Sequence, residues 1–219
     1  MLIWMKWKSC MQKNPNLDLF SAANCNYFYT NLTQPVLQEI TEQCEQFRPH
    51  ATPTSILTKE GIQQDKSYRD NVSCAIPTYH WFAGMIWHYI MRVNQHNFQY
   101  DITCFGDDMI EFMSYDVGGH YKWHQDHTLF NYSKHTESIE QCFDMQHQFN
   151  RKISFSLLLN DDYEGGELQI LKHPTGLTRV PRKAGTLVIF DSNCYHRVTK
   201  ITKGRRDALV GWAIGPRWR

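Results

Sequence analysis

Apolar residues recur at helical spacing in two stretches of the N-terminal part of the chain. Leu37, Ile40 and Cys44 follow one another at intervals of three and four, and Pro35 suits the first turn of such a helix. The same spacing recurs over about residues 78–94 and predicts a second helix. We therefore expect the N-terminal part to be helical and loop-rich.

From about residue 108 the pattern changes to short runs that alternate or are wholly apolar, as is typical of strands. Glycine-rich and Asn-Asp turn signals separate these runs. The predicted strands cover residues 109–115, 153–159, 167–171, 186–190 and 208–214. Closely spaced strands without helices between them indicate a sandwich or a barrel, not βαβ units.

No linker composition divides the chain, so we expect one domain over residues 1–219. Its helical part, about residues 1–105, should pack on the outer face of a β core that covers about residues 106–216. The expected fold class is therefore mainly β with flanking helices. The polar segment 127–150 interrupts the strands and is typical of a long functional insertion such as a lid.

Composition narrows the class of protein. Of the 219 residues 42% are hydrophobic, which is enough apolar mass for a core, and 23 Lys and Arg nearly balance 22 Asp and Glu. No apolar run approaches the roughly 20 residues of a membrane-spanning helix, and Lys6 and Lys8 interrupt the apolar start of the chain. Seven cysteines without a CxxC pair are typical of reduced thiols. We expect a cytoplasmic protein with no membrane partner.

Charge is nevertheless uneven along the chain. Residues 172–219 hold 11 Lys and Arg but only two acids, Asp191 and Asp207. A basic face could favour an acidic peptide or a nucleic acid. We favour a solvated surface instead, because strands distribute these charges over several faces.

His124 and Asp126 are the first candidates for chemistry, because residues i and i+2 of a strand point to the same face. This pair alone is weak evidence, since 11 His and 13 Asp in 219 residues give about 0.65 HxD pairs by chance. His196, after another predicted strand, could add a third ligand. Two histidines and one carboxylate form the facial triad that suits non-haem Fe(II) and leaves coordination positions open.

Arg206 strengthens this interpretation. It lies ten residues after His196 and opens the predicted strand 208–214. Alternation sends Arg205 and Arg206 to opposite faces, and the register from His196 favours Arg206 as the inward one. A buried guanidinium needs a partner, and a carboxylate ligand would supply it. A metal triad beside such an Arg is what a 2-oxo acid with a second carboxylate requires.

The ordered motifs resemble the Fe(II)/2-oxoglutarate-dependent dioxygenases, specifically the prolyl 4-hydroxylase-like family. The matching stretches are residues 115–126, 151–160, 163–168, 184–190 and 196–206. The resemblance implies a double-stranded β-helix core, a jelly-roll or cupin-like arrangement. It also implies His124, Asp126 and His196 as iron ligands, with Arg206 as the catalytic-site anchor for the distal carboxylate of 2-oxoglutarate. Many prolyl 4-hydroxylases carry Lys at the anchor position, so this chain departs mildly from the pattern.

Three aromatic residues match family positions beside the cosubstrate. Tyr115 and Tyr121 match tyrosines that line its pocket, and Trp212 matches an adjacent aromatic. Tyr115 and Tyr121 could equally be ordinary core residues, because half-buried aromatics at strand ends are common, and Trp212 is interpreted as a core aromatic that borders the pocket. The histidines that lie near the triad in the sequence, at 120, 127, 135 and 147, are interpreted as solvated loop residues.

The family resemblance further implies the cofactors and the reaction. These are Fe(II), 2-oxoglutarate and O2, with ascorbate as reductant, and hydroxylation of a substrate C–H with release of succinate and CO2. The family branch favours a prolyl residue in a protein or peptide. The sequence gives no signal for an oligomeric state.

Three alternatives stay open. The same chemistry could act on nucleic acid, but the oxidative demethylases carry a second Arg six residues after the anchor, where this chain has Trp212. It could act on a free amino acid. The chain could also be a non-catalytic metal-binding β-helix module, since zinc accepts His and Asp ligands and fold does not fix function.

Overall fold

A computed structural model describes residues 8–9, 27–58, 61–126, 149–172 and 176–216. Its main feature is a large antiparallel sheet in the spatial order β1-β2-β15-β11-β18-β9-β7-β3, with β8 also paired to β18. The bounds are β1 Lys8–Ser9, β2 Tyr27–Asn31, β3 Thr52–Pro53, β7 Val72–Pro77, β8 Cys104–Phe105, β9 Met109–Tyr115, β11 Phe149–Leu158, β15 Thr186–Asp191 and β18 Arg206–Pro216.

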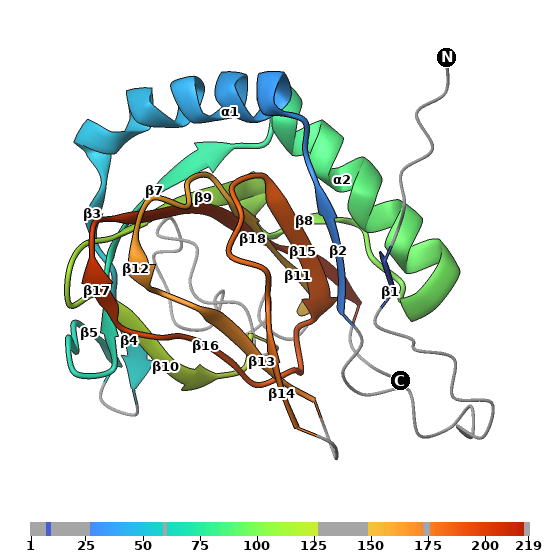
Figure 1. Ribbon diagram of the computed structural model, residues 1–219. Coiled ribbons are helices and arrows are strands. Elements are labelled where there is room, and N and C mark those ends of the chain that lie inside the picture. The colour runs from blue at the N-terminus through green and yellow to red at the C-terminus, as the bar shows by residue number, and fades with distance from the viewer. Residues whose placement is uncertain (1–7, 10–26, 59–60, 127–148, 173–175, 217–219) are drawn as a thin grey trace.

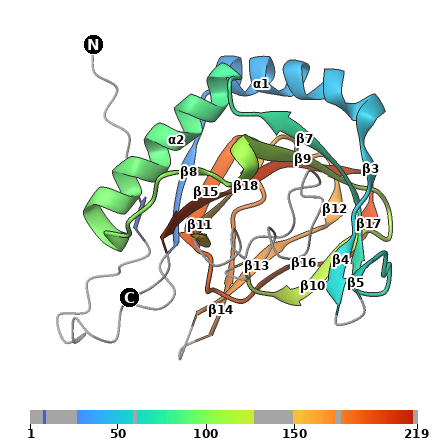
Figure 2. The same ribbon diagram turned by 180° about the vertical axis from the view of Figure 1, so that it is seen from behind.

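A smaller antiparallel sheet has the order β14-β13-β16-β10-β6. Its strands are β6 Arg69–Asp70, β10 His120–His124, β13 Leu168–Lys172, β14 Gly176–Arg179 and β16 His196–Val198. Two short pairs complete the strands, β4 Ile56–Thr58 with β5 Gly61–Gln63, and β12 Glu164–Gly165 with β17 Ile201–Lys203. The two sheets face each other across an interior, as Figures 1 and 2 show from opposite sides, and form the expected double-stranded β-helix.

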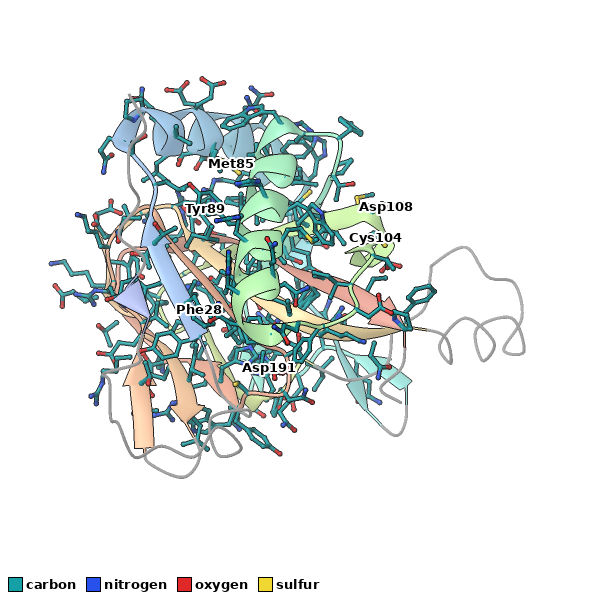
Figure 3. The ribbon with its side chains drawn as sticks, turned by 90° about the vertical axis from the view of Figure 1, so that its right-hand side faces the viewer. Phe28, Met85, Tyr89, Cys104, Asp108 and Asp191 are labelled. Carbon is teal, nitrogen blue, oxygen red and sulfur yellow. The ribbon has the colours of Figure 1, made fainter. Side chains whose placement is uncertain are left out.

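Both α-helices cover the outer face of the large sheet (Figure 1). They are α1, Gln34–Phe47, and α2, Trp81–Val93, and the short helical turns are Arg48–His50, Asn94–Phe98 and Gly106–Asp108. Figure 3 shows α2 lying across the strands, with Met85 and Tyr89 along it. This arrangement leaves the inner face of the large sheet to face the small sheet.

Alternation along the strands separates two core clusters. On β9, Ile110 and Phe112 join the cluster under the helices, whereas Met113 and Tyr115 join the cluster between the sheets. Burying large apolar side chains contributes roughly 1.5–3 kcal/mol each, so both clusters stabilise the strands that carry the interior side chains.

The two predicted helices and the five predicted strands are confirmed, with α2 beginning at Trp81 and not at residue 78. The prediction that the N-terminal part is helical and loop-rich was wrong in one respect: it also supplies β1, β2, β3, β6, β7 and β8 to the two sheets. These strands have two to six residues, too few for a periodic pattern to stand out from a loop. The predicted insertion lies almost wholly at 127–148, outside the described residues.

Among the described residues, no helix is both long and apolar enough to cross a membrane.

Candidate metal centre and its pocket

The pairing of β10 with β16 brings the two candidate histidines together. His124 lies directly across from His196 in the antiparallel register, and their ring centroids are 4.1 Å apart. Asp126 follows the end of β10, where its backbone N–H donates to Ser192 O at 2.9 Å. Its carboxylate lies 3.7 Å from His124 Nε2 and 3.3 Å from His196 Nε2. One ligand atom from each of the three residues falls within 4.8 Å of the others, and the described residues contain no second such group.

The other ring nitrogen of each histidine is held by the backbone. His124 Nδ1 lies 2.7 Å from Lys122 O, and His196 Nδ1 lies 3.0 Å from Cys194 O. A carbonyl can only accept, so Nδ1 carries the proton and the Nε2 lone pairs point to the shared centre. This arrangement of backbone partners is the usual way in which proteins orient metal-binding histidines.

Asp126 is held in the same manner. Ser154 Oγ, on β11, donates to Asp126 Oδ2 at 2.8 Å and lies 2.9 Å from Ser192 Oγ. A buried carboxylate with a hydroxyl donor keeps a fixed orientation.

The electrostatics of His124 and Asp126 favour the protonation states of metal ligands. Burial, followed by the neighbouring His196, lowers the pKa of His124 to about 3, so its ring is neutral. Burial acts to raise the pKa of Asp126, but the two imidazoles outweigh it and hold that pKa well below its usual value. Burial acts to lower the pKa of His196, whereas the Asp126 carboxylate reverses the direction and raises it. Neutral imidazole and ionised carboxylate are the forms that bind a divalent metal, so His124 and Asp126 already fit Fe(II), and a protonated His196 would release its second proton on binding.

A cavity of about 890 Å³ opens beside the three residues. Its wall includes all seven residues that the sequence singled out, namely His124, Asp126, His196, Arg206, Tyr115, Tyr121 and Trp212. It also includes Arg69 and Arg151, which no motif in the sequence marks as site residues. Candidate ligands, a buried cation and aromatic walls thus share one space.

Arg206 points into this space, and only 3% of it is exposed. Arg205 points outward, with 46% of its side chain exposed, as alternation along β18 requires. The Arg206 guanidinium carbon lies 5.5 Å from the centre of the Tyr115 ring. Its Nε is buried and has no hydrogen-bond partner among the described residues. A buried cation with a donor to spare fits an anionic ligand such as a carboxylate.

The three aromatic candidates occupy different positions. Tyr115 is buried and pairs with Arg206 across β9 and β18. Tyr121 stacks on His124 with ring centroids 3.5 Å apart. Trp212 lies under the guanidinium of Arg151, whose carbon is 3.7 Å from the ring centre. Burial raises the pKa of both tyrosines, so their hydroxyl groups stay protonated.

The histidines outside the triad lie elsewhere or outside the described residues. His120 contacts two backbone carbonyls, Gly118 O at 3.1 Å and Ser67 O at 3.2 Å. His127, His135 and His147 fall in 127–148, which the structure does not describe.

Comparison with known proteins agrees with the fold. The family model of the 2OG-Fe(II) oxygenase superfamily matches residues 110–214. A PKHD-type hydroxylase of Parvibaculum lavamentivorans is 47% identical over 62 residues, which are 27% of this chain and 28% of that protein. One from Psychrobacter sp. is 32% identical over 103 residues, 46% of this chain and 36% of that protein. The chain therefore spans well under half the length of these curated relatives.

Two solved structures share the fold. A prolyl-4-hydroxylase of Pseudomonas putida has a TM-score of 0.65 at 19% identity, over 87% of this chain and 92% of that chain. A Trichoplax adhaerens prolyl hydroxylase, in complex with a hypoxia inducible factor peptide fragment, has a TM-score of 0.65 at 16% identity. The match covers 85% of this chain and 82% of that chain. Both similarities extend beyond the family match into the N-terminal part of this chain.

Proposed function

We propose that this chain is an Fe(II)- and 2-oxoglutarate-dependent hydroxylase of the 2OG-Fe(II) oxygenase superfamily, whose family model matches residues 110–214. The observation that carries the proposal is the grouping of His124, Asp126 and His196 on one cavity wall with the buried Arg206. The alternative of a non-catalytic metal-binding module lacks a reason for the unsatisfied donor of Arg206 inside the same cavity.

Each residue has a defined role in this proposal. His124 and His196 would bind iron through Nε2, and Asp126 through its carboxylate. Arg206 would bind the distal carboxylate of 2-oxoglutarate with charge-assisted hydrogen bonds. When bound, the iron couples O2 and the oxidation of 2-oxoglutarate to oxidation of a substrate C–H bond, with succinate and CO2 as co-products. Tyr115, Tyr121 and Trp212 would exclude water from this space.

We propose a prolyl residue in a protein or peptide as the substrate. Support comes from the fold shared with prolyl hydroxylases, one of them in complex with a peptide fragment. Nucleic acid is less favoured, because several basic side chains of the C-terminal part have local partners. Arg179 pairs with Glu167 at 3.2 Å and Lys203 with Glu164 at 3.1 Å, while Arg206 is buried in the cavity.

The first test of the cofactors is binding without O2. Mn(II), a redox-stable substitute for Fe(II), and then 2-oxoglutarate are titrated into the protein. We expect His124→Ala to lose Mn(II) binding. We expect Arg206→Met to weaken 2-oxoglutarate binding by about 10- to 100-fold, since hydrogen bonds to charged groups contribute about 1.5–3 kcal/mol. Arg205→Met, the outward neighbour, is the matched control and should bind normally. Absence of metal-dependent 2-oxoglutarate binding in the parent protein would contradict the proposal.

The substrate is tested by succinate formation with Fe(II), ascorbate and O2. A panel of proline-containing peptides is compared with the same peptides carrying Ala for Pro, with single-stranded oligonucleotides and with free amino acids. Stimulation by the proline peptides alone is the expected result. If another class of substrate stimulated succinate formation and none of the peptides did, the proposed prolyl substrate would be wrong and the proposed iron chemistry would stand.

A further inference from the structure

The strand that carries His124 is irregular just before this residue. On a regular strand Tyr121 and His124, three positions apart, would point to opposite faces. Tyr121 pairs with Val198 and His124 with His196, so three steps on β10 match two steps on β16. This β-bulge adds one residue to β10 and turns both side chains to the same face. Their rings therefore stack, with an angle of 17° between the planes.

Tyr68 makes hydrogen bonds to the backbone of Lys122 and Trp123, the two residues between Tyr121 and His124 in the bulge. Lys122 N–H donates to Tyr68 O at 3.0 Å, and the Tyr68 hydroxyl donates to Trp123 O at 3.1 Å. These two bonds hold the peptide groups 121–122 and 123–124. The peptide group between them carries Lys122 O. That carbonyl is the partner of His124 Nδ1 at 2.7 Å. The orientation of the imidazole thus depends on a bulge that Tyr68 keeps in place.

Arg69 acts on the other partner of the imidazole, the Tyr121 ring. Its guanidinium carbon lies 4.5 Å from the ring centre, while its Nε donates to Asn71 Oδ1 at 2.8 Å. The Tyr68 ring also meets Tyr121 edge-on, with centroids 5.9 Å apart. Tyr121 is therefore fixed by two neighbours from β6 and the residue before it, and it presents its face to His124.

We propose that Tyr68 and Arg69 are positioning residues that hold His124 in its metal-binding orientation, Tyr68 through the bulge and Arg69 through Tyr121. The inference rests on the proposed function, because it takes His124 to be an iron ligand. Neither residue is one of the three candidate ligands, although both line the same cavity. Both precede the family match at 110–214, so a part of the chain outside that match completes the metal site.

The experiment compares three single variants in the full-length protein. Tyr68→Phe removes one hydrogen bond and keeps the ring, and Arg69→Met removes the guanidinium and keeps most of the stem. Arg197→Met is the matched control, because Arg197 lies 4.7 Å from the adjacent Trp123 ring and contacts Gln169 instead of the Tyr121 ring. Mn(II) affinity is measured by electron paramagnetic resonance without 2-oxoglutarate or O2. We expect Tyr68→Phe and Arg69→Met each to weaken binding by about 10-fold, as for other partners of metal ligands, and Arg197→Met to leave it unchanged.

A second measurement, by ¹⁵N NMR, determines the tautomer of the His124 imidazole in the metal-free protein. In protein with ¹⁵N-labelled histidine, the His124 signal of the parent should show a single form protonated at Nδ1. Tyr68→Phe and Arg69→Met should shift it toward a mixture of tautomers. Arg69→Lys, which restores a cation near the Tyr121 ring, should recover part of both effects.

The outcomes separate this inference from the proposed function. Parent-like Mn(II) affinity in well-folded Tyr68→Phe and Arg69→Met would overturn the positioning role and leave the oxygenase proposal intact. Failure of the parent itself to bind Mn(II) would count against the oxygenase proposal. The histidine spectra would then decide the positioning role alone, and an unchanged His124 signal in both variants would overturn it.

Discussion

Ser154 shows how residues that contact the candidate ligands, without being ligands themselves, determine the geometry of the site. It lies on β11, is 1% exposed, and donates to the Asp126 carboxylate. The hydroxyl is a side-chain donor to that carboxylate, whereas the two histidines turn their Nε2 lone pairs toward the same centre. Its loss would leave Asp126 free to rotate in a buried space.

We expect Ser154→Ala to weaken Mn(II) binding by about 10-fold, because partners of metal ligands commonly contribute that much. Isothermal titration with Mn(II) measures the change. Ser156→Ala is the control, since Ser156 is two residues along the same face of β11 and makes no hydrogen bond to Asp126. Equal affinity in the two variants would show that the Ser154 hydroxyl is dispensable.

At the scale of single residues, the sequence identifies the candidate ligands and Arg206 but not the residues that position them. His124, Asp126, His196 and Arg206 could be predicted because their types and spacing match a known chemical task. Arg69 could not, because it lies on a two-residue strand whose pairing with β10 no local pattern reveals. Supporting residues are selected by three-dimensional neighbours, which a single sequence does not contain.

Among the elements, helices were easier to predict than strands. α1 and α2 each run for more than three turns, so their apolar stripes repeat often enough to be recognised. β10 and β16 carry two of the candidate ligands but alternate only over three to five residues. The family motif located these ligands where periodicity alone did not.

The turn at Gly165 requires glycine for a definite reason. Its φ is +74°, and an added Cβ would lie 2.1 Å from the backbone oxygen of Lys200 where β12 meets β17. We expect Gly165→Ala to lower the free energy of unfolding by at least about 2 kcal/mol, the cost of a strained backbone position plus a clash with backbone. Urea denaturation measures it.

Gly84 of α2 gives the matched control for this substitution. A Cβ there meets no atom within 4 Å, and alanine is the better helix former. We expect Gly84→Ala to raise the free energy of unfolding by about 0.5–1 kcal/mol. Destabilisation by both variants would mean that the contact at Lys200 is not the cause.

At the scale of the whole molecule, an ionic network ties α1 to the large sheet. Arg48, just after α1, pairs with Glu45 and with Asp207 at the start of β18, the latter at 2.9 Å. Ser114 of β9 donates to the same Asp207 carboxylate at 2.6 Å. Helix and central strands therefore share one set of partly buried charges.

We expect Arg48→Met to lower the free energy of unfolding by about 1–3 kcal/mol at pH 7, because the buried Asp207 loses one of its two cations and keeps Arg205 at 3.1 Å. The hydrogen bond from Arg48 lowers the pKa of Glu45. A lowered folded pKa adds stability above the unfolded value of about 4.3, and this is lost as pH falls through the folded pKa. The effect of the variant should therefore be smaller at pH 3.5 than at pH 7. Urea denaturation at both values tests this, and an equal loss at both would contradict the role of Glu45.

The same connections bear on the proposal that residues 1–219 act as one domain. The cluster under the helices joins Ile40 and Phe82 to Phe155 of β11, and β7 extends the large sheet beyond β9. The β6 strand pairs with β10 beside the candidate metal centre. An N-terminal part with this many contacts should not unfold before the β core. We expect far-UV circular dichroism, tryptophan fluorescence and Mn(II) release to follow one urea transition with one midpoint. A helical signal lost at lower urea, with Mn(II) still bound, would instead make the helices a separate unit and would limit the catalytic domain to the β core.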